Sequence, residues 1–557
     1  MQFRWNHTQG APDYNRETGF GFVTGAVYTA DAGLHIPETN SGFLPLWWYA
    51  GTPISDIRQS EYGLQATAAE ALRTEDAADR RLPVWLRIQV PGEGVYRAEI
   101  TVTGTDGGEV LVFTGRRRLA WRGVLPAGAQ QIVTAYCDVF PIVPRGQADA
   151  VASDAVNIAI VGGALSAVAL AEAPHTRRIW VCGDSTVTDQ TGELPYAPGT
   201  SYAGWGQMLP AYLPEVCITN HAHSGLTTES FLSEGHWAIV KPRLRAGDVC
   251  LFQFGHNDQK LAHLQARGGY TDRLRTYIKE TRTAGAVPVL ITPLARNSWR
   301  DPTHYNDFLA DFADAVLDLG KEEAVPVLDL HAYAMQLIRQ EGLETAKRWF
   351  YPGDYTHTND FGAYRMAGFV AGALGKAVGL PVADSPAWTP APPFAPLTPP
   401  KDCALPAPDT DPFADYDATR PQEVLTRAEA LELAIKALKL FPINVYNDLY
   451  ADIVGHETYA GTVQCAAQND LIPAAWVADG RLYPQRTVTA ADFLAVLMPG
   501  AAGRRPLAAP SPLPDSVPAY ARFAAGQAVA EQLISADSLN DPITRSDAAA
   551  LCRRLHI

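Results

Sequence analysis

The chain has 557 residues, enough for three or four domains, and its 47% hydrophobic and 19% charged residues are typical of globular proteins. Its net charge of −15 argues against a nucleic-acid binder, which needs a basic face. An acidic substrate would also be repelled at long range, so it must meet positive charge locally.

Short apolar or alternating stretches separated by polar turns fill residues 1–172. Examples are VWLRIQV, VYRAEITVTG and EVLVFTG, and no long helical pattern lies between them. We predict an all-β sandwich for this part of the chain. The uncharged run at residues 155–171 is short for a membrane span and contains Gly162-Gly163, so we expect two strands joined by a Gly-Gly hairpin turn.

Residues 173–382 have a different pattern, in which apolar strands alternate with helical segments. The expected strands are RIWVCGD, VCITNHA, VCLFQFGHND, VPVLITPLARN and VPVLDLHA, and helical periodicity lies between them, as in YTDRLRTYIKETRTAG and YNDFLADFADAVLDLG. Five such strands predict a parallel, doubly wound α/β sheet. Ligands of these sheets bind beyond the carboxyl ends of the strands.

A proline-rich stretch at residues 383–410 is predicted to be a stiff linker, and residues 411–557 are predicted to form an all-α repeat module. Three helix starts in this module share one frame: LTRAEALELAIKAL, VTAADFLAVLM and ITRSDAAALCRRL. In each, a threonine stands three residues before an acid, which predicts a threonine N-cap. The pairs are Thr426/Glu429, Thr489/Asp492 and Thr544/Asp547.

The cysteines and the N-terminus bear on the cellular location. None of the seven cysteines is spaced as CxxC, so we expect reduced core thiols with neither a disulfide frame nor a zinc site. The first residues, MQFRWNHTQGAPDYN, do not have the pattern of a signal peptide. We therefore expect a cytoplasmic protein; the alternative is a secreted or wall-attached protein from which a signal has been removed.

The chemistry of residues 173–382 centres on Ser185, which follows the first expected strand. A serine nucleophile needs a base, and the base needs an orienting acid. His357 and Asp354 lie three residues apart before the last helix and supply both groups. Gly225 and Asn257 follow two other strands and offer donors for an oxyanion. The nearby His223 and His256 have no acid or cysteine at metal-ligand spacing, so we expect no metal.

The four loops stand in one order: GDSTV, Gly225, GHND and DYTHTNDFGA. This pattern resembles that of the SGNH (GDSL-like) hydrolases. The residues of the individual motifs are similar to those of the rhamnogalacturonan acetylesterases of carbohydrate esterase family 12. The resemblance implies a flavodoxin-like α/β core. It also implies hydrolysis of O-acetyl esters on pectic, rhamnogalacturonan-type carbohydrate through an acetyl-serine, without metal or cofactor.

The resemblance also implies a role for each matching residue. Ser185 matches the nucleophile, His357 the base and Asp354 its orienting acid. The backbone N–H of Ser185, together with Gly225 and Asn257, matches the oxyanion hole. Four motifs in order on one expected scaffold are a specific signal, whereas each motif alone is a weak one.

One position departs from the family pattern. Many members have arginine after the glycine of the second loop, and this chain has Leu226. The departure leaves the triad intact but removes one expected contact with an acidic sugar. Arg296 and Arg300, just past the fourth expected strand, are candidates for that contact, although solvated surface arginines are an equally good interpretation.

The flanking parts of the chain also resemble known modules. Residues 1–172, with FRWNHTQG and ETGFGF, look like the galactose-binding-like β-sandwich that precedes some bacterial members; it either binds sugar or supports the esterase, and we favour support. The helical repeats resemble S-layer homology modules, with LTRAE and ITRSD at the helix starts. That resemblance implies binding to a cell-wall polymer, and self-association is the other interpretation.

Two other functions compete with a pectic acetylesterase. An SGNH esterase acting on another acetylated glycan, such as xylan, would use the same catalytic residues. A non-catalytic carbohydrate-binding or wall-associated protein is the third hypothesis, and the completeness of the predicted triad argues against it.

Overall fold

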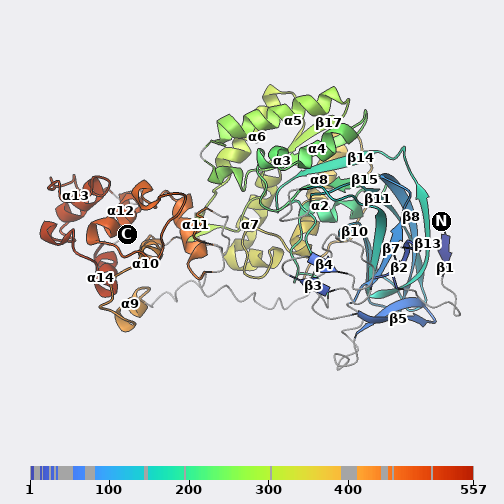
Figure 1. The fold of residues 1–557 in the computed structure, drawn as a ribbon, viewed down its shortest axis with the longest axis horizontal. Helices are drawn as coiled ribbons and strands as arrows, with labels where there is room; N and C mark the ends of the chain where they lie inside the picture. The colour runs from blue at the N-terminus through green and yellow to red at the C-terminus, as the bar shows by residue number, and fades with distance from the viewer. Residues whose placement is uncertain are drawn as a thin grey trace.

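The structure is a computed structural model. It describes residues 2–4, 13–15, 17–23, 27–29, 33–35, 54–68, 82–143, 149–192, 196–261, 263–301, 304–390, 411–438, 440, 449–453, 457–502 and 506–555. Figure 1 shows three groups of elements: antiparallel sheets in blue and cyan, a parallel sheet with helices in green and yellow, and helices in orange and red.

The first group consists mainly of two antiparallel sheets. Strands follow the order β11-β8-β13-β6-β5 in one sheet, where β1 also pairs with β13, and β10-β9-β12-β7-β2 in the other. The bounds are β1 Gln2–Arg4, β2 Phe20–Phe22, β5 Ile54–Ser60, β6 Gly63–Ala68, β7 Val84–Gln89, β8 Gly94–Gly104, β9 Glu109–Thr114, β10 Arg118–Val124, β11 Gln130–Val139, β12 Ala155–Val161 and β13 Gly163–Glu172, with a separate pair β3 Val27–Thr29 and β4 Gly33–His35.

The two larger sheets share one buried apolar core. Ile100 and Val102 of β8 join Ile158 and Ile160 of β12 in the same cluster, although the strands belong to different sheets. Alternating apolar residues produce such a core when two sheets face each other. The all-β character predicted for residues 1–172 is confirmed where the chain is described.

The hairpin predicted at Gly162-Gly163 is wrong. Both strands exist, but β12 pairs with β7 and β9, whereas β13 pairs with β8, so Gly162 carries the chain from one sheet to the other. Gly162 has a φ of +81°, and a Cβ there would lie 2.2 Å from the carbonyl oxygen of Glu109. Only glycine fits this crossing. The apolar pattern does not distinguish a turn within one sheet from a crossing between two.

The second group is the predicted parallel sheet, which is confirmed. Its order is β15-β14-β16-β17-β20, and every neighbouring pair is parallel. The strands are β14 Arg178–Gly183, β15 Cys217–Asn220, β16 Val249–Gln253, β17 Val287–Ile291 and β20 Val327–Leu328. All residues of β14 and β16 are buried, which explains their continuous apolar runs. The strand order reverses beside β14, the second strand of the sheet, and such sheets bind ligands at this switch point.

Helices connect and flank these strands. They are α2 Trp205–Met208, α3 Ser230–Ser233, α4 His236–Val240, α5 Thr271–Thr283, α6 Ala310–Glu322, α7 Leu330–Ala346 and α8 Asp360–Val378. Helices α5 and α6 confirm the two helical segments quoted from the sequence. The side chain of Asn359 caps α8 by accepting a hydrogen bond from the Gly362 N–H at 3.0 Å. Within the described part of the chain, no helix is both long and apolar enough to cross a bilayer.

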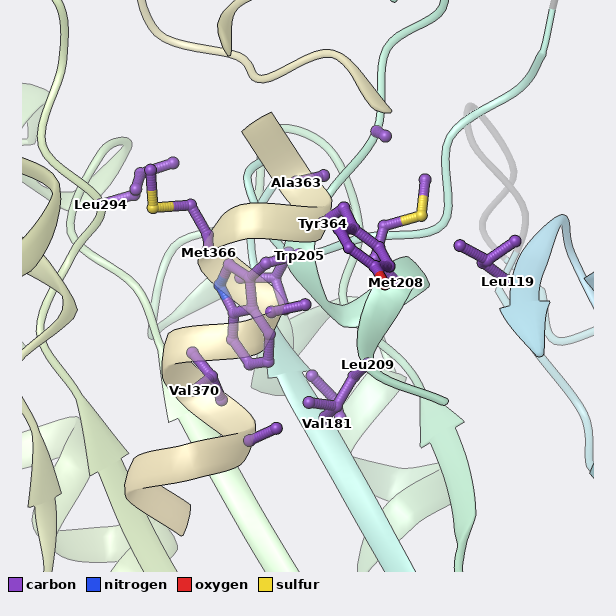
Figure 2. Packing of buried hydrophobic residues seen from close by; sticks show 14 of the residues in the cluster. Leu119, Val181, Trp205, Met208, Leu209, Leu294, Ala363, Tyr364, Met366 and Val370 are labelled. Atoms are coloured by element: carbon purple, nitrogen blue, oxygen red, sulfur yellow. The ribbon is translucent and has the colours of Figure 1, made fainter. Parts of the chain in front are cut away.

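The first group is joined to the second by a common core. The β10-β9-β12-β7 sheet contributes side chains to the cluster that also contains Val181, Trp205 and Met208. Figure 2 shows Leu119 of β10 pointing toward Met208 of α2. The contributing side chains of that sheet are Trp85, Leu111, Phe113, Leu119, Ala159 and Val161. Both faces of this sheet are therefore buried in part, one in each core.

The third group, near the C-terminus, has an apolar cluster of its own, drawn from residues 413–555. Its helices are α9 Ala414–Ala418, α10 Arg427–Ala437, α11 Ala460–Gln468, α12 Ala490–Ala502, α13 Arg522–Ala530 and α14 Arg545–Leu555. The predicted caps are confirmed: Thr426 and Glu429 form a reciprocal capping box, and the hydroxyls of Thr489 and Thr544 accept from the N–H groups of Asp492 and Asp547.

The expected linker at residues 383–410 begins on the α/β domain. Trp388 is buried, and its ring meets those of Phe361 and Tyr364 edge to face at 5.2 and 5.5 Å. The Ala383 N–H donates to the Tyr212 carbonyl at 2.9 Å. The chain up to this tryptophan therefore belongs to the α/β core, and residues 391–410 lie outside the described residues.

Candidate active site

Ser185 lies in a tight turn at the carboxyl end of β14. The carboxylate of Asp184 accepts hydrogen bonds from the Thr186 N–H at 2.9 Å and the Thr186 hydroxyl at 2.7 Å. The Val187 N–H closes the turn by donating to the Asp184 carbonyl at 3.1 Å. This local network fixes the backbone around Ser185, so the serine is presented at the edge where the strand order reverses.

Three predicted side chains form one hydrogen-bonded line. The Ser185 Oγ lies 2.7 Å from His357 Nε2, and His357 Nδ1 lies 2.8 Å from Asp354 Oδ2. The carboxylate assigns the ring proton to Nδ1, which leaves the Nε2 lone pair facing the serine hydroxyl. A histidine in this state can take the proton of Ser185 as its oxygen attacks a carbonyl carbon.

Asp354 is held as an anion by its surroundings. Burial raises the pKa of its carboxyl, but the charge and hydrogen bond of His357 and two backbone donors outweigh burial and lower the pKa below the ordinary value. The two donors are the N–H groups of Thr356 and His357, at 2.7 and 2.9 Å from Oδ1. The turn that positions the acid therefore also keeps it charged.

The predicted oxyanion donors lie on three loops. In the described part of the chain, the N–H groups of Ser185 and Gly225 have no hydrogen-bond acceptor. The loop of Gly225 is held against the nucleophile strand because the His223 N–H donates to the Gly183 carbonyl at 3.1 Å. The amide of Asn257 donates to the Leu226 carbonyl at 2.9 Å and so ties the second and third loops together.

A buried network behind the nucleophile was not anticipated from the sequence. The carboxylate of Asp184 contacts His256 Nδ1 at 3.2 Å, and His256 Nε2 contacts the Leu294 carbonyl at 2.9 Å. Gln253 donates to the Thr186 hydroxyl at 2.6 Å. Both nitrogens of His256 are thus engaged in this network, and the described residues contain no cluster of metal-ligating side chains.

Two aromatic side chains beside the triad were also missed. The rings of Tyr202 and Tyr351 stack with centroids 3.6 Å apart, and the Tyr202 ring meets His357 edge to face at 5.7 Å. Lone tyrosines in loops carry no pattern in the sequence, since only the folded chain brings residues 202 and 351 together. Tyr202 packs against the histidine ring, and Tyr351 stacks on Tyr202.

Leu226, which departs from the family pattern, and the candidate Arg296 are both buried. Leu226 is buried in an apolar cluster with Phe231 and Phe254. Arg296 is 3% exposed, and burial lowers the pKa of its guanidinium to about 10, with Asp184 and Asp354 opposing the shift. Its Nη2 is 3.5 Å from the His256 carbonyl, and its Nε and Nη1 have no partner among the described residues.

Arg300 lies in the short strand β18 (Trp299–Asp301), which pairs with β19 (His304–Tyr305). Its side chain lies outside the described residues. The roles of both arginines in substrate binding stay predictions.

Comparison with known proteins agrees with this geometry. A sequence model of the GDSL-like lipase/acylhydrolase family matches residues 181–365, which include the triad. The chain is 33% identical over 222 residues to the rhamnogalacturonan acetylesterase RhgT of Bacillus subtilis, covering 37% of this chain and 93% of that protein. The chain belongs to the GDSL-like lipase/acylhydrolase family, a family of ester hydrolases.

Two further similarities are more distant. An uncharacterized esterase of Bacillus subtilis, YxiM, is 28% identical over 368 residues, which cover 64% of this chain and 82% of that protein. Axe2, an acetylxylan esterase from Geobacillus stearothermophilus, is a solved structure with 18% identity and a TM-score of 0.28, covering 37% of this chain and 94% of that one.

Proposed function

We propose that the protein is a carbohydrate O-acetylesterase that removes acetyl groups from pectic, rhamnogalacturonan-type glycans. The observation that carries the proposal is the hydrogen-bonded line from Ser185 through His357 to Asp354. The similarity to rhamnogalacturonan acetylesterase RhgT supports the choice of substrate. The family membership supports the ester-hydrolase chemistry.

The first half of the proposed reaction transfers the acetyl group to the enzyme. His357 Nε2 takes the hydroxyl proton of Ser185 as Oγ bonds to the acetyl carbon, and the carbonyl oxygen becomes an oxyanion. The N–H groups of Ser185 and Gly225 and the amide of Asn257 donate to this oxyanion. When it collapses, the bond to the sugar oxygen breaks, and that oxygen takes the proton from His357.

The second half returns the enzyme to its starting state. A water molecule attacks the acetyl-serine carbonyl while His357 takes one of its protons. Collapse of the second oxyanion releases acetic acid and returns the proton from His357 to Ser185 Oγ. Asp354 stabilises the imidazolium in both halves without being protonated itself.

Initial rates of acetate release from two glycans at equal acetyl concentration test the substrate class. We expect kcat/KM to be at least about tenfold higher for acetylated rhamnogalacturonan oligosaccharides than for acetylated xylan oligosaccharides, because one well-placed contact changes transition-state binding by this order. Equal or higher activity on xylan would contradict the pectic assignment and leave the esterase mechanism standing. Binding to the glycan with no acetate released from either substrate would favour a non-catalytic carbohydrate-binding protein.

A further inference from the structure

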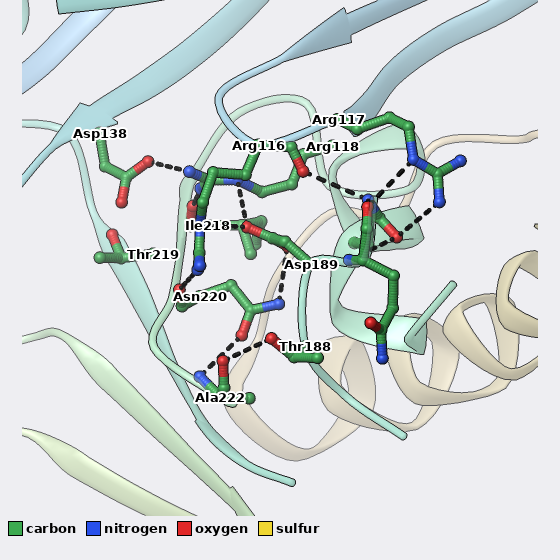
Figure 3. Close-up of polar contacts among 12 residues, drawn as sticks. Arg116, Arg117, Arg118, Asp138, Thr188, Asp189, Ile218, Thr219, Asn220 and Ala222 are labelled. Atoms are coloured by element: carbon green, nitrogen blue, oxygen red, sulfur yellow. Dashed lines mark hydrogen bonds and ion pairs between the residues drawn. The ribbon is translucent and has the colours of Figure 1, made fainter. Parts of the chain in front are cut away.

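Three consecutive arginines lie where the turn after β9 leads into β10: Arg116 and Arg117 belong to the turn, and Arg118 is the first residue of β10. They lie outside the part of the chain that the family model matches. Figure 3 shows Arg116 and Arg118 beside Asp189, with Arg117 pointing away from its two neighbours. Arg117 has a φ of +56°, a left-handed backbone conformation that non-glycine residues adopt rarely. The turn keeps a bulky residue in this conformation and places its side chain in the α/β domain.

The guanidinium of Arg117 is fully buried and contacts three separate segments of the α/β domain. Its Nη1 forms an ion pair with Asp360 Oδ1 at 2.7 Å, at the start of α8. Its Nε donates to the Gln190 carbonyl at 3.1 Å, and its Nη2 donates to the Tyr202 carbonyl. One planar group with fixed donor directions therefore sets the spacing of two loops and the start of α8.

The Gln190 segment leads directly to the nucleophile. The side-chain amide of Gln190 donates to the carbonyl of Ser185 itself at 2.9 Å. Arg117 therefore reaches the serine through one intervening residue, and a shift of the Gln190 backbone would move the Ser185 turn.

The other two segments lead to the base. The Tyr202 ring packs against the His357 ring, and the neighbouring Ala203 exchanges hydrogen bonds with Thr358, at 3.0 Å to its carbonyl and 2.7 Å from its hydroxyl. Asp360 follows two residues later and is the first residue of α8. Arg117 thus holds the histidine loop from two sides.

Both partners of the ion pair between Arg117 and Asp360 are buried, so the loss of one would disturb the other. Removal of the guanidinium would leave the Asp360 carboxylate with the Tyr196 hydroxyl and the Gly199 N–H, at 2.7 and 2.9 Å, as neutral donors. A buried carboxylate that loses its cation shifts its neighbours or its protonation state. Either response acts at the helix start that follows His357.

We propose that Arg117 is a positioning residue for the reaction, through which the N-terminal sheets hold the Ser185 turn and the His357 loop in register. The inference rests on the proposed function and deepens it, since it makes the antiparallel sheets part of the working active site. The binding site of the acetylated glycan is unchanged by it.

A matched control comes from Arg122 on β10. Its guanidinium also bridges the two groups of elements, since it donates to the Pro386 carbonyl at 2.8 Å and lies over the ring of Trp388 at 5.0 Å. None of its contacts in the described chain is with the loops of Ser185 or His357. Loss of Arg122 therefore tests attachment alone, and loss of Arg117 tests attachment together with positioning.

The experiment compares the full chain with Arg117→Met, Arg117→Lys and Arg122→Met. Three readouts are the melting temperature, kcat and KM for acetate release from acetylated rhamnogalacturonan oligosaccharides, and the rate constant for labelling of Ser185 by a fluorophosphonate. We expect Arg117→Met to lower kcat and the labelling rate by about tenfold to a hundredfold with little change in KM, since small misplacements of catalytic groups have effects of this size. Arg117→Lys should lie between Arg117→Met and the wild type, and Arg122→Met should match the wild type in both rates.

Wild-type kcat and labelling in folded Arg117→Met would overturn the inference. If Arg117→Met does not fold, Arg117→Lys decides instead, because it keeps a cation for Asp360 but loses the planar donors for Gln190 and Tyr202; unchanged rates in that variant would also overturn it. Labelling separates this inference from the proposed function, since it requires no sugar. A wild type that is labelled rapidly but releases no acetate would contradict the proposed substrate, and the labelling rates of the variants would still decide the role of Arg117.

Discussion

Ser185 depends for its reactivity on two hydrogen bonds in series, and each has a separate cause in the chain. The turn of Asp184 fixes the serine backbone, and the turn of Asp354 fixes both the carboxylate and the N–H of His357. The carboxylate of Asp354 thus positions His357 at two places, the ring nitrogen Nδ1 and the backbone N–H. Loss of the charge and loss of the geometry are therefore separable by substitution.

Asp354→Asn tests the charge at nearly constant shape. The amide would present a donor toward His357 Nδ1, which favours the wrong tautomer and turns the Nε2 proton toward Ser185. We expect kcat for acetate release to fall by about 10⁴ with an unchanged melting profile. Asp354→Glu serves as the comparison that keeps the charge. A fall of less than tenfold in the asparagine variant would remove Asp354 from the triad.

Asn257→Ala tests the oxyanion hole. The variant loses one amide donor to the developing oxyanion and also the hydrogen bond to the Leu226 carbonyl. We expect kcat to fall by about 10²–10³, as is typical when one oxyanion donor is removed. Steady-state kinetics on the acetylated glycan measures this change. Unchanged turnover would mean that the Asn257 amide remains with Leu226 throughout the reaction.

At the scale of elements, helix α8 connects packing to the active site. It begins three residues after His357, and its first turn crosses the backbone of Trp349 so closely that a Cβ on Gly362 would lie 1.9 Å from the Trp349 carbonyl oxygen. The same helix contains Gly372, where an added Cβ meets nothing within 4 Å. Substitution of each glycine by alanine therefore separates the effect of helix propensity from the effect of the close contact between α8 and the Trp349 backbone.

Gly362→Ala should displace the start of α8 from Trp349 and move the His357 loop with it. We expect the melting temperature to fall and kcat to drop by at least about tenfold, because catalytic geometry tolerates little displacement. Gly372→Ala should be neutral or stabilising by up to about 1 kcal/mol, since an added Cβ meets nothing there and alanine is a better helix former than glycine. Calorimetry and initial rates on both variants check this. Equal behaviour of the two variants would contradict the role given to the close crossing.

In the whole molecule, one of the described N-terminal sheets shares a core with the α/β domain, and the C-terminal helices have a separate core. The β10-β9-β12-β7 sheet shares a core with the parallel sheet, whereas the helices beyond residue 411 have a cluster of their own. The division between catalytic body and C-terminal helices therefore falls after Trp388, which packs on Phe361 and Tyr364 of α8.

Two truncations test that division. A chain ending at Pro390 keeps Trp388 and should retain wild-type kcat, whereas a chain ending at Leu380 exposes the α8 surface that Trp388 covers. Burial of one large aromatic side chain is worth about 3–5 kcal/mol by substitution, so the shorter chain should melt at a clearly lower temperature. An inactive chain ending at Pro390 would show that the C-terminal helices belong to the catalytic body.

Much of the site was predictable because its residues are local in sequence. Ser185, Asp354 and His357 stand in short motifs at strand and helix ends, and fully buried parallel strands are continuous apolar runs. Arg117 was not predictable, since Gly-Arg-Arg-Arg in a turn is typical of an exposed basic loop and its partner Asp360 lies 243 residues away. Gly162 and Trp388 were misinterpreted for a related reason: the sequence around each fits a hairpin or a linker, and only long-range packing shows otherwise.

Acetate release by the wild type and by Ser185→Ala, measured on acetylated rhamnogalacturonan oligosaccharides, decides whether Ser185 is the nucleophile of an acetylesterase. We expect release by the wild type and a loss of several orders of magnitude in the variant, with the fold unchanged by circular dichroism, because the nucleophile is gone while its supporting network remains. Release by Ser185→Ala at a rate near that of the wild type would contradict the assignment of Ser185 as the nucleophile and with it the acetyl-serine mechanism.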